Sequence, residues 1–276
     1  ILRYSKWKNK KTVGKGQKMN VVKREIAQLF KMPISYGCMI LYACILLMGI
    51  LEDLSIGTGI SSNGWFQQYW YAENFSVGQL VSPLIFPIAI SGICAEEQKG
   101  HYSWLVLMRS GYKKYCIQKL SAAIVESIIL YTVSIFLAVC VGSILFPTVL
   151  EASTAKSLAA SYPGGLWEKL AMKMGYWFSF FLYVLLNSLN IGIFSIMAIC
   201  VSVFSVNRYV IAALPFFLSR LGSYAGGWLA KITYTPFGKE WDADGGSIRC
   251  IAVNGIAYLI LSLMFIMALK WRRRHG

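Results

Sequence analysis

The chain has 276 residues, of which 57% are hydrophobic and 14% charged, with a mean hydropathy of +0.55 and a formal net charge of +15. A soluble domain carries about 25% charged residues, so the composition argues against a soluble enzyme. The basic residues lie at the ends of apolar runs, and orientation in a lipid bilayer explains them better than nucleic-acid binding does.

Residues 1–18 form a basic N-terminal segment. No short apolar run with a small-residue cleavage site follows it, so the segment does not have the pattern of a secretory signal. The sequence starts at Ile1, so we expect the native start to be missing or trimmed, and Met19 offers an internal start. Residues 19–276 are expected to form one membrane domain.

A short amphipathic helix is predicted over Val21–Lys31, ahead of a break at Pro33. A basic amphipathic helix that precedes a span usually lies in the membrane interface. Its predicted apolar face consists of Val22, Ile26, Leu29 and Phe30.

Six apolar runs approach the ~20 residues that a helix needs to cross ~30 Å of hydrocarbon. They cover roughly residues 34–51, 75–95, 120–146, 174–204, a run from 209 that loses clarity after 220, and 250–269. Pro83 and Pro87 lie inside the second run and predict kinks there. The predicted fold class is an all-α membrane protein with six transmembrane helices.

The connecting segments differ in charge. Most of the 27 Lys and Arg residues lie before the first span, between the second and third, at Asn207–Arg208, or after the last. Cytoplasmic loops carry this excess, which predicts a multi-pass protein of the cytoplasmic membrane with both termini in the cytoplasm. We expect two segments on the outer side of the membrane. Residues 52–75 carry aromatics suited to an outer interface belt, and residues 147–173 are expected to form a polar loop.

Common catalytic motifs are absent. The sequence has no GxxxxGK[ST], GxSxG or HExxH, and its cysteines form no CxxC that would suggest a zinc site. We therefore expect no catalytic residue, bound metal or cofactor. One alternative is an intramembrane enzyme in which Glu96 and Glu97 activate water. Such proteases resemble EExxxR followed by histidines on later spans, but His101 stands at the arginine position and no later span contains histidine.

The segment 96–119 carries an apolar patch around Trp104, Leu105 and Met108 between charged residues. It fits a short amphipathic helix whose apolar side is buried against lipid or a partner protein. It fits an ordinary solvated loop equally well, and the residues alone leave both interpretations open.

The order of residues here resembles the first cytoplasmic loop of ABC-2-type ABC transporter permeases. That loop has the pattern E-x-x-x-G-T-x-x-x-L-x-x-x-P, then a basic residue and a lysine at the next span. The matching residues are Glu96, Gly100, Leu105 and Lys119, with Lys113 or Lys114 at the basic position. His101 replaces the threonine, and Ser110–Gly111 supplies the turn in place of the proline.

The resemblance implies a permease domain, which is the membrane subunit of an ATP-driven exporter. Such a domain has six spans, an interfacial helix, and short re-entrant helices between spans five and six. Residues 221–249 would supply the re-entrant helices. It implies that Glu96–Tyr115 docks as a coupling helix on a separate ATPase, which holds ATP and Mg. The docking residues would be Glu96, Glu97, Gly100, Trp104, Leu105, Met108, Arg109, Lys113 and Lys114.

A second permease copy or a homologue would complete the pathway within membrane lipid. The exported compound would be hydrophobic or amphipathic, such as a peptide, antibiotic or lipid, and resistance to an antimicrobial peptide is one role of this kind. A scaffold or sensor that transports nothing is the remaining alternative.

Two kinds of polar side chain fall inside the spans. Charges in hydrocarbon cost roughly 2.5–3.5 kcal/mol on insertion scales, so we predict an ion pair between Glu126 and Arg220, with snorkelling of Arg220 to the interface as the alternative. Asn187 and Asn190 are expected to hydrogen-bond neighbouring helices rather than to line a substrate route.

Overall fold

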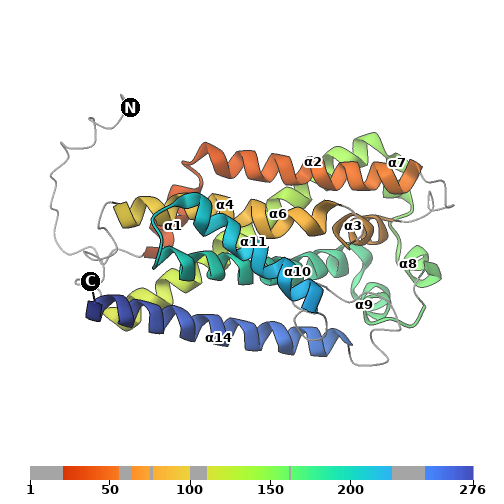
Figure 1. Cartoon of the computed structure of the whole chain (residues 1–276). Coiled ribbons are helices and arrows are strands. Elements are labelled where there is room, and N and C mark those ends of the chain that lie inside the picture. Colours follow the sequence, from red (N-terminus) through yellow and green to blue (C-terminus); the bar gives the residue numbers. More distant parts are fainter. Residues whose placement is uncertain are drawn as a thin grey trace.

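The computed structural model describes residues 21–55, 64–74, 77–99, 111–161, 163–225 and 246–275, which are helical wherever they are regular (Figure 1). The helices are α1 (Val21–Leu29), α2 (Pro33–Ser55), α3 (Trp65–Asn74), α4 (Val77–Lys99), α6 (Tyr112–Leu145), α7 (Pro147–Glu151), α8 (Ala155–Ser161), α9 (Leu166–Met174), α10 (Tyr176–Ser202), α11 (Arg208–Ala225) and α14 (Gly246–His275). The all-α class is confirmed for this part of the chain.

Five of these helices are long and apolar enough to cross a membrane: α2, α4, α6, α10 and α14. The described residues thus support a membrane-spanning protein. The predicted fifth span corresponds to α11, which has 18 residues with Pro215 inside it and is not among these five. Helix α6 starts at Tyr112, eight residues before the predicted span, because a helix can continue beyond the apolar layer.

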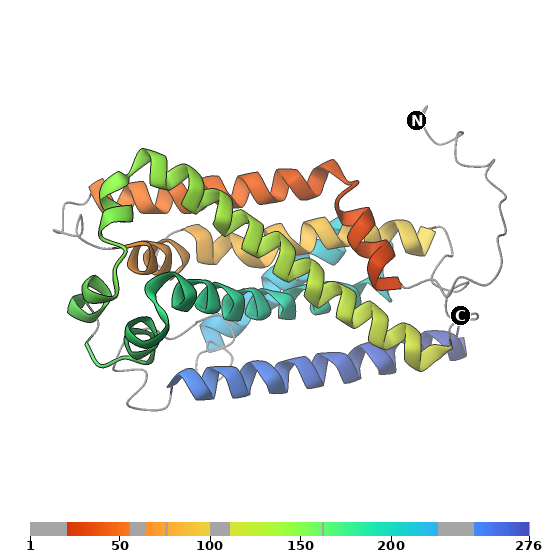
Figure 2. The ribbon, with the colours of Figure 1, turned by 180° about the vertical axis from the view of Figure 1, so that it is seen from behind.

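The long helices run in alternating directions along one bundle (Figures 1 and 2). One end holds α1, the end of α4, the start of α6, the α10–α11 connection and the end of α14, and we call it the basic end. The opposite end holds α3, α7, α8 and α9, and we call it the α3 end. The start of α2 and the end of α14 therefore lie at the same end of the bundle.

Helix α1 packs against α6 and α4, and Pro33 starts α2 in the first-turn position that proline tolerates. The predicted apolar face of α1 is partly wrong. Glu25 and Leu29 are its buried residues, whereas Phe30 is exposed. Glu25 is buried because Lys119 of α6 forms an ion pair with it, as described below.

Helix α3 corrects the expectation for residues 52–75. The aromatics Trp65 and Tyr69 are buried rather than spread over an outer interface. The Trp65 backbone N–H donates to Ser153 Oγ at 3.0 Å, and the Phe66 N–H donates to Tyr176 Oη at 2.6 Å. These acceptors satisfy N–H groups that a helix leaves open in its first turn, so α3 can be buried at its N-terminus.

A polar network ties α3 to three long helices. Asn187 of α10 donates to Tyr69 Oη at 2.8 Å, Tyr69 is hydrogen-bonded to Tyr131 of α6, and Tyr42 of α2 donates to Glu73. The predicted hydrogen bond from Asn187 to a neighbouring helix is confirmed, whereas the buried Oδ1 of Asn190 has no hydrogen-bond partner among the described residues. Burial raises the pKa of the Glu73 carboxyl to about 7, although hydrogen bonds from Tyr42 and Tyr131 oppose the rise.

The predicted polar loop 147–173 is wrong as a loop, because it folds into α7, α8 and α9. These helices are short, but they pack on other elements: α9 lies against α10 and α8, and α7 lies against α6 and α3. Together they enclose α3 at its end of the bundle (Figure 2).

The last long helix, α14, packs mainly on α10. Gly192 of α10 leaves room for the ring of Tyr258, whose hydroxyl donates to the Leu189 carbonyl. A Cβ at position 192 would meet that hydroxyl, so the small residue sets how closely the two helices approach.

Three predictions concern residues outside the described ranges. They are the basic segment 1–18, residues 100–110 at the centre of the predicted docking segment (Glu96–Tyr115), and residues 226–245, which contain most of the predicted re-entrant region.

Candidate functional site at the basic end

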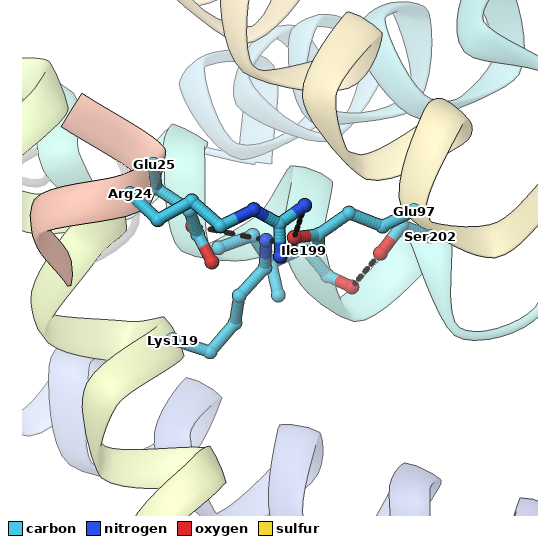
Figure 3. A network of polar contacts seen from close by, with 6 residues as sticks. All are labelled: Arg24, Glu25, Glu97, Lys119, Ile199 and Ser202. Carbon is cyan, nitrogen blue, oxygen red and sulfur yellow. Dashed lines mark hydrogen bonds and ion pairs between the residues drawn. The ribbon is translucent and has the colours of Figure 1, made fainter. Parts of the chain in front are cut away.

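A buried ion cluster joins the two helices on either side of the segment that is predicted to dock (Figure 3). Lys119 Nζ of α6 lies 2.7 Å from Glu97 Oε2 of α4 and 3.0 Å from Glu25 Oε2 of α1. Arg24 Nη2 of α1 lies 3.7 Å from Glu97 Oε1. We call these four residues the ion cluster, and they join α1, α4 and α6 at the basic end.

Three of the four residues of the ion cluster are almost fully buried. Glu25, Glu97 and Lys119 are each at most 5% exposed. Taking charges out of water costs several kcal/mol per ion unless partners compensate, and here each of the three has an opposite charge within 3.0 Å. Burial raises the pKa of Glu25 to about 7, and Lys119 opposes this rise.

Local helix geometry puts these side chains in place. Glu25 and Leu29 lie one turn apart on the buried side of α1. Glu97 lies near the end of α4 and Lys119 two turns into α6. The Glu97–Lys119 ion pair therefore joins the two helices that flank the predicted docking segment. The cluster thus brings residues far apart in the sequence to one point.

A small cavity adjoins the cluster on the side of α10 and α14. It measures about 10 Å³, room for roughly one water molecule. Its lining residues are Cys94, Glu97, Tyr115, Lys119, Ile199, Ser202, Val203, Phe265 and Leu269. Ser202 Oγ donates to its own helix at the Ile199 carbonyl, at 2.7 Å (Figure 3).

The neighbouring acid, Glu96, faces an open groove of about 680 Å³. The groove runs from the end of α4 to the turn between α10 and α11. Its lining residues are Gly92, Ala95, Glu96, Val206, Asn207, Arg208 and Tyr209. Successive residues on a helix project about 100° apart, which is why Glu96 is exposed while Glu97 is buried.

The structure separates the predicted docking residues into three groups. Glu97 is in the ion cluster, Glu96 lines the groove, and Lys113 and Lys114 are exposed in the first turn of α6. The other predicted positions lie outside the described residues, and they are Gly100, Trp104, Leu105, Met108 and Arg109, together with His101 of the enzymatic alternative.

The predicted Glu126–Arg220 pair is not among the ion pairs that the described residues form. Glu126 is buried on α6, and the charges that act on it are Glu25, Glu97 and Lys119. The Arg220 guanidinium lies over the Phe216 ring, 5.8 Å from its centroid.

Sequence reasoning missed Arg24 and Glu25 as site residues. A signal was present, because Glu25 is the single acid in the basic stretch 21–31 and lies one helical turn from Leu29. Lys119 was identified only through the permease resemblance. Its carboxylate partners come from α1 and α4, and their proximity depends on how the helices pack.

Within the described ranges, no group of three or more His, Cys, Asp and Glu residues is placed to hold a metal ion. The enzymatic alternative requires Glu96 and Glu97 to act on one water molecule. Glu97 is held by Lys119 and Arg24, while Glu96 is exposed at the groove, so the described geometry does not favour that alternative.

Comparison of the chain with protein-family models, with curated proteins and with solved structures found no match. Its function must therefore be argued from its residues and their geometry.

Proposed function

We propose that this chain is the membrane-embedded permease subunit of an ATP-driven ABC exporter. The observation that carries the proposal is the buried Glu97–Lys119 pair, which fixes both roots of the segment that resembles a permease coupling loop. The segment would dock on a separate ATPase, which would bind ATP and Mg. This chain would contribute no catalytic residue.

The ion cluster suits force transmission. A displacement of the docking segment acts on α4 and α6 through their buried salt bridge and on α1 through Glu25 and Arg24. Helix α4 also packs against α10 and α11. Because packed helices move as rigid elements that slide or rotate, ATPase closure at the basic end can change the packing along the bundle.

The proposed topology has six spans, with α11 as the fifth and both ends of the domain in the cytoplasm. At ~1.5 Å rise per residue, the 18 residues of α11 extend about 27 Å, close to the hydrocarbon thickness. If α11 did not cross, an odd number of crossings would put the start of α2 and the end of α14 on opposite sides. Instead they lie at one end of the bundle (Figure 1).

A second copy or a homologue would complete the pathway. Helices α11 and α14 expose large apolar side chains, including Phe217, Leu221, Leu259 and Met267, that suit contact with lipid or with a second subunit. The proposed substrate is a hydrophobic or amphipathic compound, such as a peptide, antibiotic or lipid.

The proposal predicts that an ATPase copurifies with the tagged chain from its native membrane. Changing Trp104, Leu105 and Met108 together to Ser removes the apolar side of the docking segment and is expected to abolish copurification. A matched control changes Leu150, Leu166 and Met172 to Ser, since these exposed apolar residues lie at the α3 end, and it is expected to retain the ATPase.

A chain that emerges without an ATPase from several mild detergents, or equal retention by both triple variants, would contradict the proposed docking. Enzymatic turnover by the purified chain without nucleotide or partner would instead favour the alternative based on Glu96, Glu97 and His101.

A further inference from the structure

A third carboxyl accompanies the ion cluster. Glu126 lies two turns beyond Lys119 on α6 and is 1% exposed, and its Oε1 has no hydrogen-bond partner. The charged groups that act on it are Glu25, Glu97 and Lys119. Among the described residues, the ion cluster and Glu126 together contribute three carboxyls and two cations, Lys119 and Arg24, to the junction of α1, α4 and α6.

An excess negative charge in such a place is costly, and a buried carboxyl avoids the cost by taking up a proton. Glu97 has two cationic partners. Glu25 has one, and Glu126 has none within ion-pair distance in the described part of the chain. The proton therefore belongs to Glu25 and Glu126.

We propose that Glu25 and Glu126 form a proton-binding site that holds one shared proton at the α1–α4–α6 junction and exchanges it with solution at the basic end. The exchange route would pass the cavity beside Lys119, which has room for one water, or the partly exposed Arg24. The proposal does not depend on an ATPase partner.

Among the described residues, the further cation near the cavity is Arg272 of α14, which donates to the carbonyl of the lining residue Val203 at 3.1 Å. The cavity adds the titratable groups Cys94 and Tyr115, while α10 and α14 contribute Ser202 and apolar side chains to it. The first turns of α2, which packs on α6, carry buried Cys38 and Tyr42. Thiols and phenols are neutral at physiological pH in such surroundings.

Binding of this proton is linked to the packing of α1 against α4 and α6. The pKa of Glu25 is about 7 when α1 is docked, above its ordinary value of 4.5, so the docked state binds the proton more tightly than an undocked α1 would. The stabilisation is complete below the ordinary pKa and is lost as the pH rises through about 7. Acidification at the basic end thus tightens α1 against α4 and α6.

Infrared titration of the full chain in lipid vesicles tests the site, because a protonated carboxyl has its own C=O stretching band. Wild type is expected to lose two such bands as the pH rises through about 7, one from the junction and one from Glu73. Glu73→Gln should remove one band. Glu126→Gln and Glu25→Gln should each remove the other, because either leaves two carboxylates facing two cations.

Glu151→Gln, an exposed change on α7, is the matched control and should leave both bands. A band that disappears with only one of the two junction variants would contradict a shared proton. Wild type with no titrating band beyond that of Glu73 would overturn the site altogether.

A second measurement needs no variant. Hydrogen exchange in α1 of wild type, corrected for the intrinsic effect of pH, should be slower at pH below 7 than above it. Equal protection on both sides would contradict the link between the proton and the docking of α1.

Discussion

Lys119→Met is expected to lower the free energy of unfolding by about 3–5 kcal/mol, the usual cost of removing one partner from a buried ion pair. Methionine retains the apolar stem but leaves Glu25 and Glu97 without their 3.0 Å and 2.7 Å contacts. Thermal unfolding of the purified chain in detergent, followed by circular dichroism, measures the change.

Lys113→Met is the control, since Lys113 is exposed on the same helix and should change the free energy by less than about 0.5 kcal/mol. Adding Glu25→Gln and Glu97→Gln to Lys119→Met should recover part of the loss, because the two side chains that lose Lys119 are then neutral. Equal effects of the two lysine changes would show that the ion cluster does not stabilise the basic end.

Phe66→Ala is expected to cost about 3–5 kcal/mol, as large-to-small changes of buried aromatics do. The Phe66 ring is fully buried and lies 5.1 to 6.0 Å, centroid to centroid, from four other aromatic rings. These rings belong to Trp167, Tyr176, Phe180 and Tyr183. The cavity would loosen α3 from the bundle.

The matched control is Phe178→Ala on α10, because that ring is 51% exposed and should leave little cavity behind. Both unfolding midpoints and the proteolysis rate near residues 64–74 would be compared. If Phe178→Ala destabilises the chain as much as Phe66→Ala, α3 is not held by its aromatic contacts.

The long helices were predictable because membrane thickness sets a length that can be counted directly in the sequence. The apolar runs for α2, α4, α10 and α14 agree with the helices to within a few residues, apart from charged or polar turns at their ends. Pro83 and Pro87 did not interrupt α4, which remains one helix through both.

Helix α3 was not predictable from its own residues. Its sequence mixes aromatics with Gln67, Gln68 and Asn74, a composition that also suits an exposed interface. What buries it are partners distant in the sequence, Ser153 and Tyr176 at its N-terminus and the α10 rings beside it. Long-range packing decided its place.

The ion cluster could not be predicted from the sequence, because it too depends on long-range packing. At the ends of apolar runs, Lys and Arg are normally explained by membrane orientation, and Lys119 fits that rule as well as Lys113 and Lys114 do. Only the packing of α1 across α4 and α6 distinguishes the buried lysine from the exposed ones.

The basic end must face the cytoplasm if an ATPase is to dock there, and labelling of single introduced cysteines tests this most directly. Lys113→Cys probes the basic end and Lys156→Cys the α3 end, both at exposed positions, with the unsubstituted chain as the background for native thiols. A membrane-impermeant maleimide is predicted to label Lys156→Cys in intact cells and Lys113→Cys only in inside-out vesicles. The reverse pattern would put the basic end outside the cell and contradict the proposed docking.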